Sequence, residues 1–139
     1  KTDQFDWIKS LTAGLDIVSG DDSKTDKLEG FSKYFGARHK HHGYYDYSSH
    51  KRYFGHAHEG LQELNLKGKF NFLASSNLLV AMHSFSSHDG ITKYGNELDL
   101  IIKRKVSDEL SSEFGLVFYN PEVGDDLLTF MYVMFTANL

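Results

Sequence analysis

Hydrophobic and polar residues alternate over long stretches of this chain. From residue 97 to 105, leucine and isoleucine occupy the even positions 98, 100 and 102, and charged residues occupy all the odd positions except Ile101. Residues 109–118 repeat the pattern after a break at Ser107 and Asp108. Because successive side chains of a strand point to opposite faces, this period of two predicts two β-strands joined by a tight hairpin. Each strand then has one apolar face and one charged face.

The same reading along the whole chain predicts six strands, all antiparallel neighbours in an up-and-down order. They cover about residues 7–18, 60–73, 78–87, 95–106, 109–119 and 127–139. In two of these strands the apolar and polar residues alternate poorly. Residues 78–87 carry apolar side chains at both parities, so the pattern does not assign their outward face, and residues 127–139 are apolar on nearly both sides.

The lengths of the strands and of their connections predict a membrane barrel. A typical soluble strand has about five or six residues, whereas the predicted strands reach the roughly nine to eleven residues that cross a bilayer. The connections, at residues 19–59, 74–76, 88–94, 107–108 and 120–126, are alternately longer and shorter. Outer-membrane barrels have short periplasmic turns and longer external loops. We therefore expect an all-β fold, an antiparallel up-and-down transmembrane β-barrel, in which residues 1–139 form a single segment and residues 19–59 form a long external loop.

Six strands are too few to close such a barrel, since about eight are needed. An open strand edge in lipid leaves backbone groups without partners. We expect the chain to be the C-terminal portion of a larger barrel, or to pair with other barrel chains.

Two other interpretations of the alternating pattern stay open. The first is a soluble lipocalin-like barrel or sandwich that binds a ligand and buries its apolar faces as a core. The second is an envelope scaffold that recruits a partner through the long loop and conducts nothing. A soluble domain of the first kind would bury a core of nine apolar residues: Leu64, Leu66, Phe70, Phe72, Leu98, Leu100, Phe114, Leu116 and Phe118.

Composition narrows the function classes. The formal net charge of -4 gives no basic field for nucleic acid, so we expect no nucleic-acid partner. The absence of cysteine removes disulfides and thiolate metal sites. The chain has no Gly-x-Ser-x-Gly elbow, phosphate loop or zincin pattern, so we expect no enzymatic activity and no cofactor.

The polar faces of the predicted strands carry charges of both signs, which are the candidate lining of a pore. The positive ones are Lys67, Lys69, Lys103 and Lys105, and the negative ones are Glu63, Glu97, Asp99 and Glu113. Glu97 and Asp99 share one strand face about 7 Å apart. Such a carboxylate pair can serve glycoside hydrolysis, but we expect Lys67, Lys69 or Lys103 on neighbouring strands to pair with it.

Six histidines and several other cations lie in the long loop. The histidines are His39, His41, His42, His50, His56 and His58. Imidazole is a common metal ligand, yet the spacings of known zinc sites are missing, so we expect solvated or packing histidines and no metal. Arg38, His39 and Lys40 are candidate solute-binding residues beside the tyrosines that follow them. That part of the loop is either folded into the pore, where it draws in anions, or exposed with its tyrosines in the interfacial belt.

Three segments carry a family resemblance: Gly-Asp-Asp at 20–22, His-Lys-His-His-Gly-Tyr-Tyr-Asp-Tyr at 39–47, and Tyr-Gly-Asn-Glu-Leu-Asp-Leu at 94–100. Their order and spacing resemble the C-terminal part of the alginate export family of outer-membrane porins. The alternation over residues 131–137 resembles the assembly signal of such barrels, which usually end in an aromatic residue where this chain has Leu139. The resemblance implies a large single-chain barrel in the bacterial outer membrane, in contact with membrane lipid. It also implies a channel for polar, anionic or saccharide-like solutes, including polysaccharides.

Overall fold

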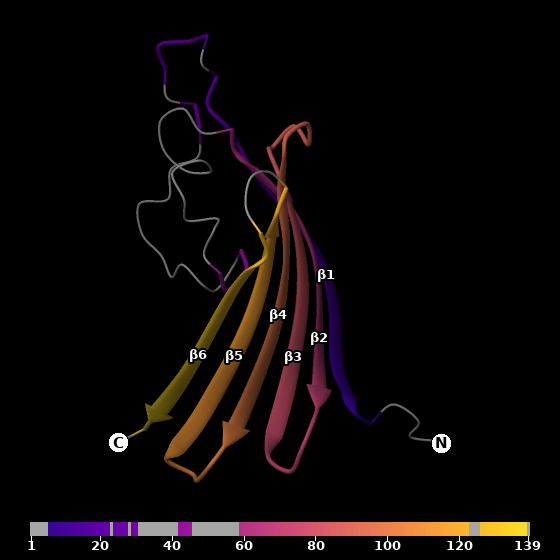
Figure 1. Ribbon diagram of the computed structural model, residues 1–139, viewed down its shortest axis with the longest axis vertical. Helices are drawn as coiled ribbons and strands as arrows, with labels where there is room; N and C mark the ends of the chain where they lie inside the picture. The colour runs from indigo at the N-terminus through magenta and orange to yellow at the C-terminus, as the bar shows by residue number, and fades with distance from the viewer. Residues whose placement is uncertain are drawn as a thin grey trace.

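The computed structural model describes residues 6–22, 24–27, 29–30, 42–45, 59–122 and 126–138. Its strands are β1 (Ile8–Val18), β2 (Leu61–Asn71), β3 (Ser76–Ser86), β4 (Lys93–Lys105), β5 (Leu110–Pro121) and β6 (Leu128–Ala137). They form one sheet in the order β1-β2-β3-β4-β5-β6, with every neighbouring pair antiparallel (Figure 1). The predicted all-β, up-and-down order of six strands is therefore confirmed.

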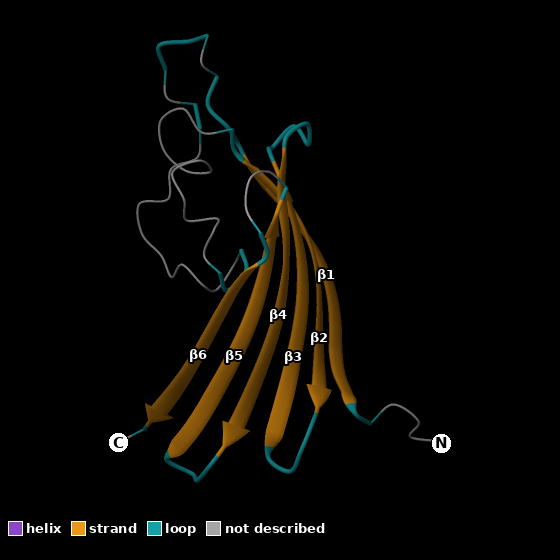
Figure 2. Ribbon diagram, viewed as in Figure 1, coloured by secondary structure: helices purple, strands orange, loops and turns teal. Residues whose placement is uncertain are grey.

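The connections divide between the two ends of the sheet (Figure 2). The short turns at residues 72–75 and 106–109 lie at the end where both termini lie, and the longer connections leave from the opposite end. The predicted alternation of short and long connections is thus confirmed. The hairpin turn predicted at residues 107–108 spans residues 106–109 and is therefore slightly wider than expected. In this turn the backbone N–H groups of Val106 and Ser107 both donate to the carbonyl of Leu110.

The sheet is open in the part of the chain that the structure describes. β1 is paired with β2 alone, and β6 is paired with β5 alone. Among the described residues, no helix is long and apolar enough to cross a membrane.

The register of the strands assigns every side chain to one of two faces. Ala13, Leu66, Met82, Leu98 and Phe118 lie side by side across five strands, and we call the face that carries them the outer face. The opposite, inner face carries the residues one position away along each strand. The register also settles β3, which the sequence pattern left unassigned, because Met82 faces outward and the residues on either side of it face inward.

Burial differs sharply between the two faces. Apolar side chains of the outer face are exposed on β1, β2, β3, β5 and β6, for example Leu66 at 54%, Met82 at 57% and Met131 at 64%, and those of β4 are half-buried. Buried residues of the strands lie mainly on the inner face. The nine apolar residues that a soluble core would need are all exposed or only partly buried in this structure.

A small apolar cluster packs on the inner face near the end with the longer connections. It consists of Leu61, Phe85, Tyr94 and Tyr119. The hydroxyl of Tyr119 donates to the backbone carbonyl of Tyr94 at 2.8 Å. The hydroxyl of Tyr94 donates to the backbone carbonyl of Gly60 at 3.0 Å. These bonds satisfy both buried phenols, so the cluster can fix this end of the sheet without an unpaired polar group.

Candidate functional site

Residues 42–45 of the long connection, which we call the inner segment, lie against the inner face. Gly43 is buried, and Tyr44 and Tyr45 are partly buried. The backbone N–H groups of Tyr44 and Tyr45 both donate to Oε1 of Glu97, at 2.6 and 2.9 Å. The ring of Tyr45 stacks on that of Tyr119 with centroids 5.4 Å apart. These four residues are therefore folded onto the inner face of the sheet.

Gly43 is required by this contact. Its φ of 80° lies in the left-handed region, which other residues rarely adopt. A Cβ at this position would also run into the carboxylate of Glu97. Glycine therefore lets the backbone approach the carboxylate closely enough for two N–H groups to reach it.

Tyr44 extends from the inner segment over β6 and the centre of the sheet. Its ring stacks on Tyr132 with centroids 6.1 Å apart. Burial is the main reason that the pKa of the Tyr44 phenol is raised above its ordinary value. The phenol is therefore a neutral hydrogen-bonding group and an apolar ring surface at physiological pH.

A diagonal chain of buried ionisable groups crosses the inner face beneath the inner segment. Oε1 of Glu63 lies 2.6 Å from Nδ1 of His83, and Nε2 of His83 lies 3.2 Å from Oδ2 of Asp99. The other oxygen of Glu63 lies 2.6 Å from Nδ1 of His42. Glu63, His83 and Asp99 are all buried. An isolated buried charge costs several kcal/mol. The contacts with the two imidazoles offset this cost and hold the carboxylates in place.

Some buried carboxyl oxygens on β4 lack a hydrogen-bond donor among the described residues. Oε2 of Glu97 and both oxygens of Asp99 accept no well-directed hydrogen bond from any described residue. His83 approaches Asp99 at ion-pair distance only. These buried oxygens on β4 therefore have acceptor capacity that the described residues do not use.

The expected pairing of Glu97 and Asp99 with lysine is wrong. Lys103 instead pairs with Glu113, at 2.6 Å, and Lys105 pairs with Asp108 in the exposed turn. The register gives the reason, because it places Lys103 opposite Glu113 and places Glu97 between His83 and Tyr119. Lys67 and Lys69 form no ion pair with any described residue.

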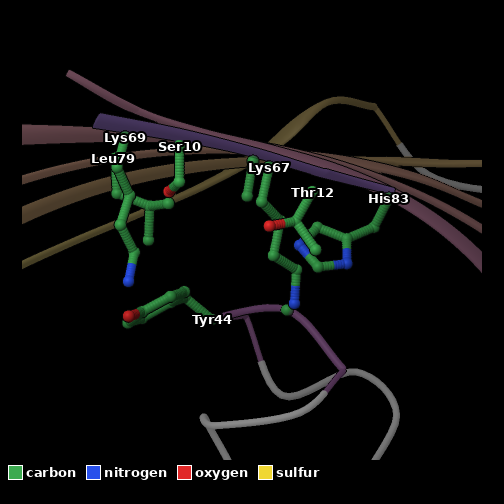
Figure 3. A pocket seen from close by; sticks show the side chains of 9 residues that line it. Ser10, Thr12, Tyr44, Lys67, Lys69, Leu79 and His83 are labelled. Carbon is green, nitrogen blue, oxygen red and sulfur yellow. The ribbon is translucent and has the colours of Figure 1, made fainter. Parts of the chain in front are cut away.

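Lys67 and Lys69 line a pocket of about 250 Å³ between the sheet and the inner segment (Figure 3). Both side chains extend from the sheet toward Tyr44. The hydroxyls of Ser10 and Thr12 on β1 are at the same pocket. Two cations, two hydroxyls and one aromatic ring form a donor set suited to a polar or anionic solute.

The structure thus gathers some of the predicted site residues and separates others. Lys67 and Lys69 meet at the pocket, Glu97 and Asp99 belong to the buried chain, and Lys103 and Lys105 lie toward the short-turn end. Arg38, His39 and Lys40 lie outside the described residues, as do all the loop histidines except His42.

No protein-family description, curated protein or solved structure matches the chain significantly.

Sequence reasoning missed His83 as part of the site, and it offered the inward folding of the tyrosine-rich loop as one of two alternatives. His83 lies in the strand whose faces the apolar pattern left ambiguous. Counting back across the short turn at residues 72–75 would have placed His83 opposite Asn65, on the charged face. No comparable signal marks Tyr44 and Tyr45, because their contact with Glu97 joins residues 53 and 52 positions apart in the chain.

Proposed function

We propose that this chain is a segment of an outer-membrane β-barrel whose inner face lets polar or anionic solutes pass. The observation that carries the proposal is the distribution of burial over the two faces. Apolar side chains are exposed on the outer face of β1, β2, β3, β5 and β6 and half-buried on that of β4, while Glu63, Glu97 and Asp99 are buried on the inner one. Lipid is the surrounding in which an apolar outer face and a charged inner face are both stable.

The size of the exposed apolar surface supports lipid over water. Soluble monomers rarely expose contiguous apolar patches beyond a few hundred Å². Here such residues lie on β1, β2 and β3, which are consecutive in the sheet, and again on β6, beyond β4 and β5. They include Leu15, Leu64, Met82, Val133 and Phe135. A soluble binding domain would have to cover this face with a second layer, and the described chain folds its inner segment onto the other face.

Both sheet edges require partners under this proposal. β1 and β6 each have one unpaired side in the described chain, and unpaired backbone groups in hydrocarbon cost several kcal/mol each. Further strands, from the same polypeptide or from other chains, would complete the barrel. The resemblance to the alginate export family motivates the single-polypeptide alternative.

The pocket of Lys67 and Lys69 is the proposed solute contact. Its lysines have no ion-pair partner among the described residues, whereas Lys103 is offset by Glu113. Free cations beside a partly buried tyrosine ring attract anions and offer a stacking surface for a sugar ring. Glu97 and Asp99 have a structural role in this proposal, since Glu97 fastens the inner segment.

Extraction and gel migration test the barrel. The full protein should require detergent to stay dispersed, and it should migrate differently on a gel before and after boiling. A monodisperse protein in plain buffer that migrates identically in both states would overturn the proposal.

Conductance in planar bilayers tests the solute path. Lys67→Leu and Lys69→Leu should each lower the permeability of anions relative to cations. Lys105→Leu is the matched control, because Lys105 is exposed and paired with Asp108 at the turn. Equal selectivity in wild type and in both pocket variants would refute the assignment of the pocket.

A further inference from the structure

Asp16, His42 and Glu63 bring three metal-binding groups together at the edge of the inner face. One ligand atom of each residue lies within 4.8 Å of the other two. Asp16 and Glu63 are directly opposed in the register of β1 and β2, and His42 reaches them from the inner segment. We propose that this triad binds a divalent first-row transition-metal ion such as Zn²⁺, which fastens the inner segment to the sheet.

The donor set selects this class of ion. An imidazole nitrogen and carboxylate oxygens are ligand atoms that Zn²⁺ accepts, and three protein ligands are the number found in open zinc sites, where water takes the fourth position. Calcium and magnesium favour oxygen ligands alone. Asp16 is exposed while Glu63 is fully buried, so the site is open to solvent on one side and rigid on the other.

Side chains next to Glu63 hold its carboxylate in the orientation that the triad requires. Its Oε1 accepts a hydrogen bond from Nδ2 of Asn65 at 3.2 Å and lies 2.6 Å from Nδ1 of His83. Its Oε2 is the oxygen that faces His42. Outer partners of this kind hold metal-binding carboxylates in position and strengthen binding.

Binding requires one local change at the triad. Nδ1 of His42 and Oε2 of Glu63 are 2.6 Å apart, whereas two ligands of a tetrahedral zinc ion, each at about 2.0–2.1 Å, are separated by roughly 3.3 Å. The ion takes the place of the proton between them, and that proton is released to solvent. The two atoms must therefore move apart by roughly 0.7 Å to admit the ion.

Calorimetric titration of the full protein with Zn²⁺ tests the inference, with Mg²⁺ as the comparison ion. Asp16→Asn is the first variant, because Asp16 is exposed and its loss leaves the buried chain intact. Its Zn²⁺ affinity should fall at least tenfold at this site. Asp108→Asn, the same chemical change in the exposed turn at residues 106–109, should leave Zn²⁺ binding unchanged.

A second pair of variants separates the triad from other histidines. His42→Ala should abolish the site, and His88→Ala, in an exposed connection, should retain it. Zn²⁺ should also slow hydrogen exchange at the amides of Tyr44 and Tyr45 in wild type and have no such effect in Asp16→Asn. Equal Zn²⁺ affinity and equal amide protection in wild type and Asp16→Asn would overturn the proposal, as would the absence of Zn²⁺ binding. Neither result bears on solute passage, so the two proposals fail separately.

Discussion

Replacing Leu66 by arginine distinguishes lipid from water at the outer face. Leu66 lies at the middle of β2, between Ala13 on β1 and Met82 on β3. Its side chain is 54% exposed. If the strands cross a bilayer, an arginine at this depth should cost about 2–4 kcal/mol of folding free energy.

The alanine variant at the same position supplies the comparison. Leu66 buries roughly half of its surface, so in water truncation to alanine should cost about 1 kcal/mol, half of the value for a fully buried leucine. In water, arginine should cost no more than alanine, because its aliphatic stem covers the same neighbours while its charge stays solvated. In lipid, the arginine variant should be the less stable of the two.

Denaturant unfolding in phospholipid vesicles measures the difference. The only tryptophan of the chain, Trp7, stacks on Phe70 with ring centroids 5.4 Å apart and reports the loss of this contact by fluorescence. Lys67→Arg, at the next position and on the inner face, is the matched control and should change stability by less than about 0.5 kcal/mol. An arginine variant as stable as the alanine variant would refute the assignment of the outer face to lipid.

Two further substitutions probe the connections. Gly43→Ala should detach the inner segment from Glu97, through backbone strain and a clash with the carboxylate, and protease should then cleave the inner segment faster. Gly90→Ala is the control, because Gly90 has a similar φ of 75° but open space around it. This variant should leave the cleavage of the inner segment unchanged. Equal cleavage of the two variants would contradict the proposed contact. Hydrogen bonds from the Ser87 hydroxyl and the Ile91 N–H lower the pKa of Asp89 below its ordinary value of 3.8. The carboxylate therefore stabilises the connection at pH values above the ordinary pKa, and this contribution disappears as the pH falls through the lowered one. In Ser87→Ala, NMR titration should show the pKa of Asp89 moved upward; an unchanged pKa would show that the hydroxyl contributes nothing.

Much of the fold could be predicted from alternation alone. Strands such as β2 and β4 have a period of two that no helix shares, and turn residues separate them, so their existence and order follow from local chemistry. The ends shift by one or two residues, as at β3, which begins at Ser76 before the expected position 78. Local pattern fails where both faces carry apolar residues, and β3 therefore received its faces only from its register with β2 and β4.

The candidate site could be predicted only in part. Lys67 and Lys69 were placed correctly on one charged face, because two residues on the same strand share a face whatever the tertiary structure. Their separation from Glu97 and Asp99 was missed, since that depends on which residues stand opposite one another on neighbouring strands. The sequence also could not show that Gly43 brings two backbone N–H groups to Glu97.

The sequence by itself determined the strands, their up-and-down order, the division of each clear strand into an apolar and a charged face, and the alternation of connections. These features depend on neighbouring residues along the chain. Only the tertiary structure decided which face is covered, how His83 lies between Glu63 and Asp99, and where His42 meets Asp16. The physical reason is that cross-strand register and the path of a long connection are set by contacts among residues far apart in sequence, whose pairing no local periodicity encodes.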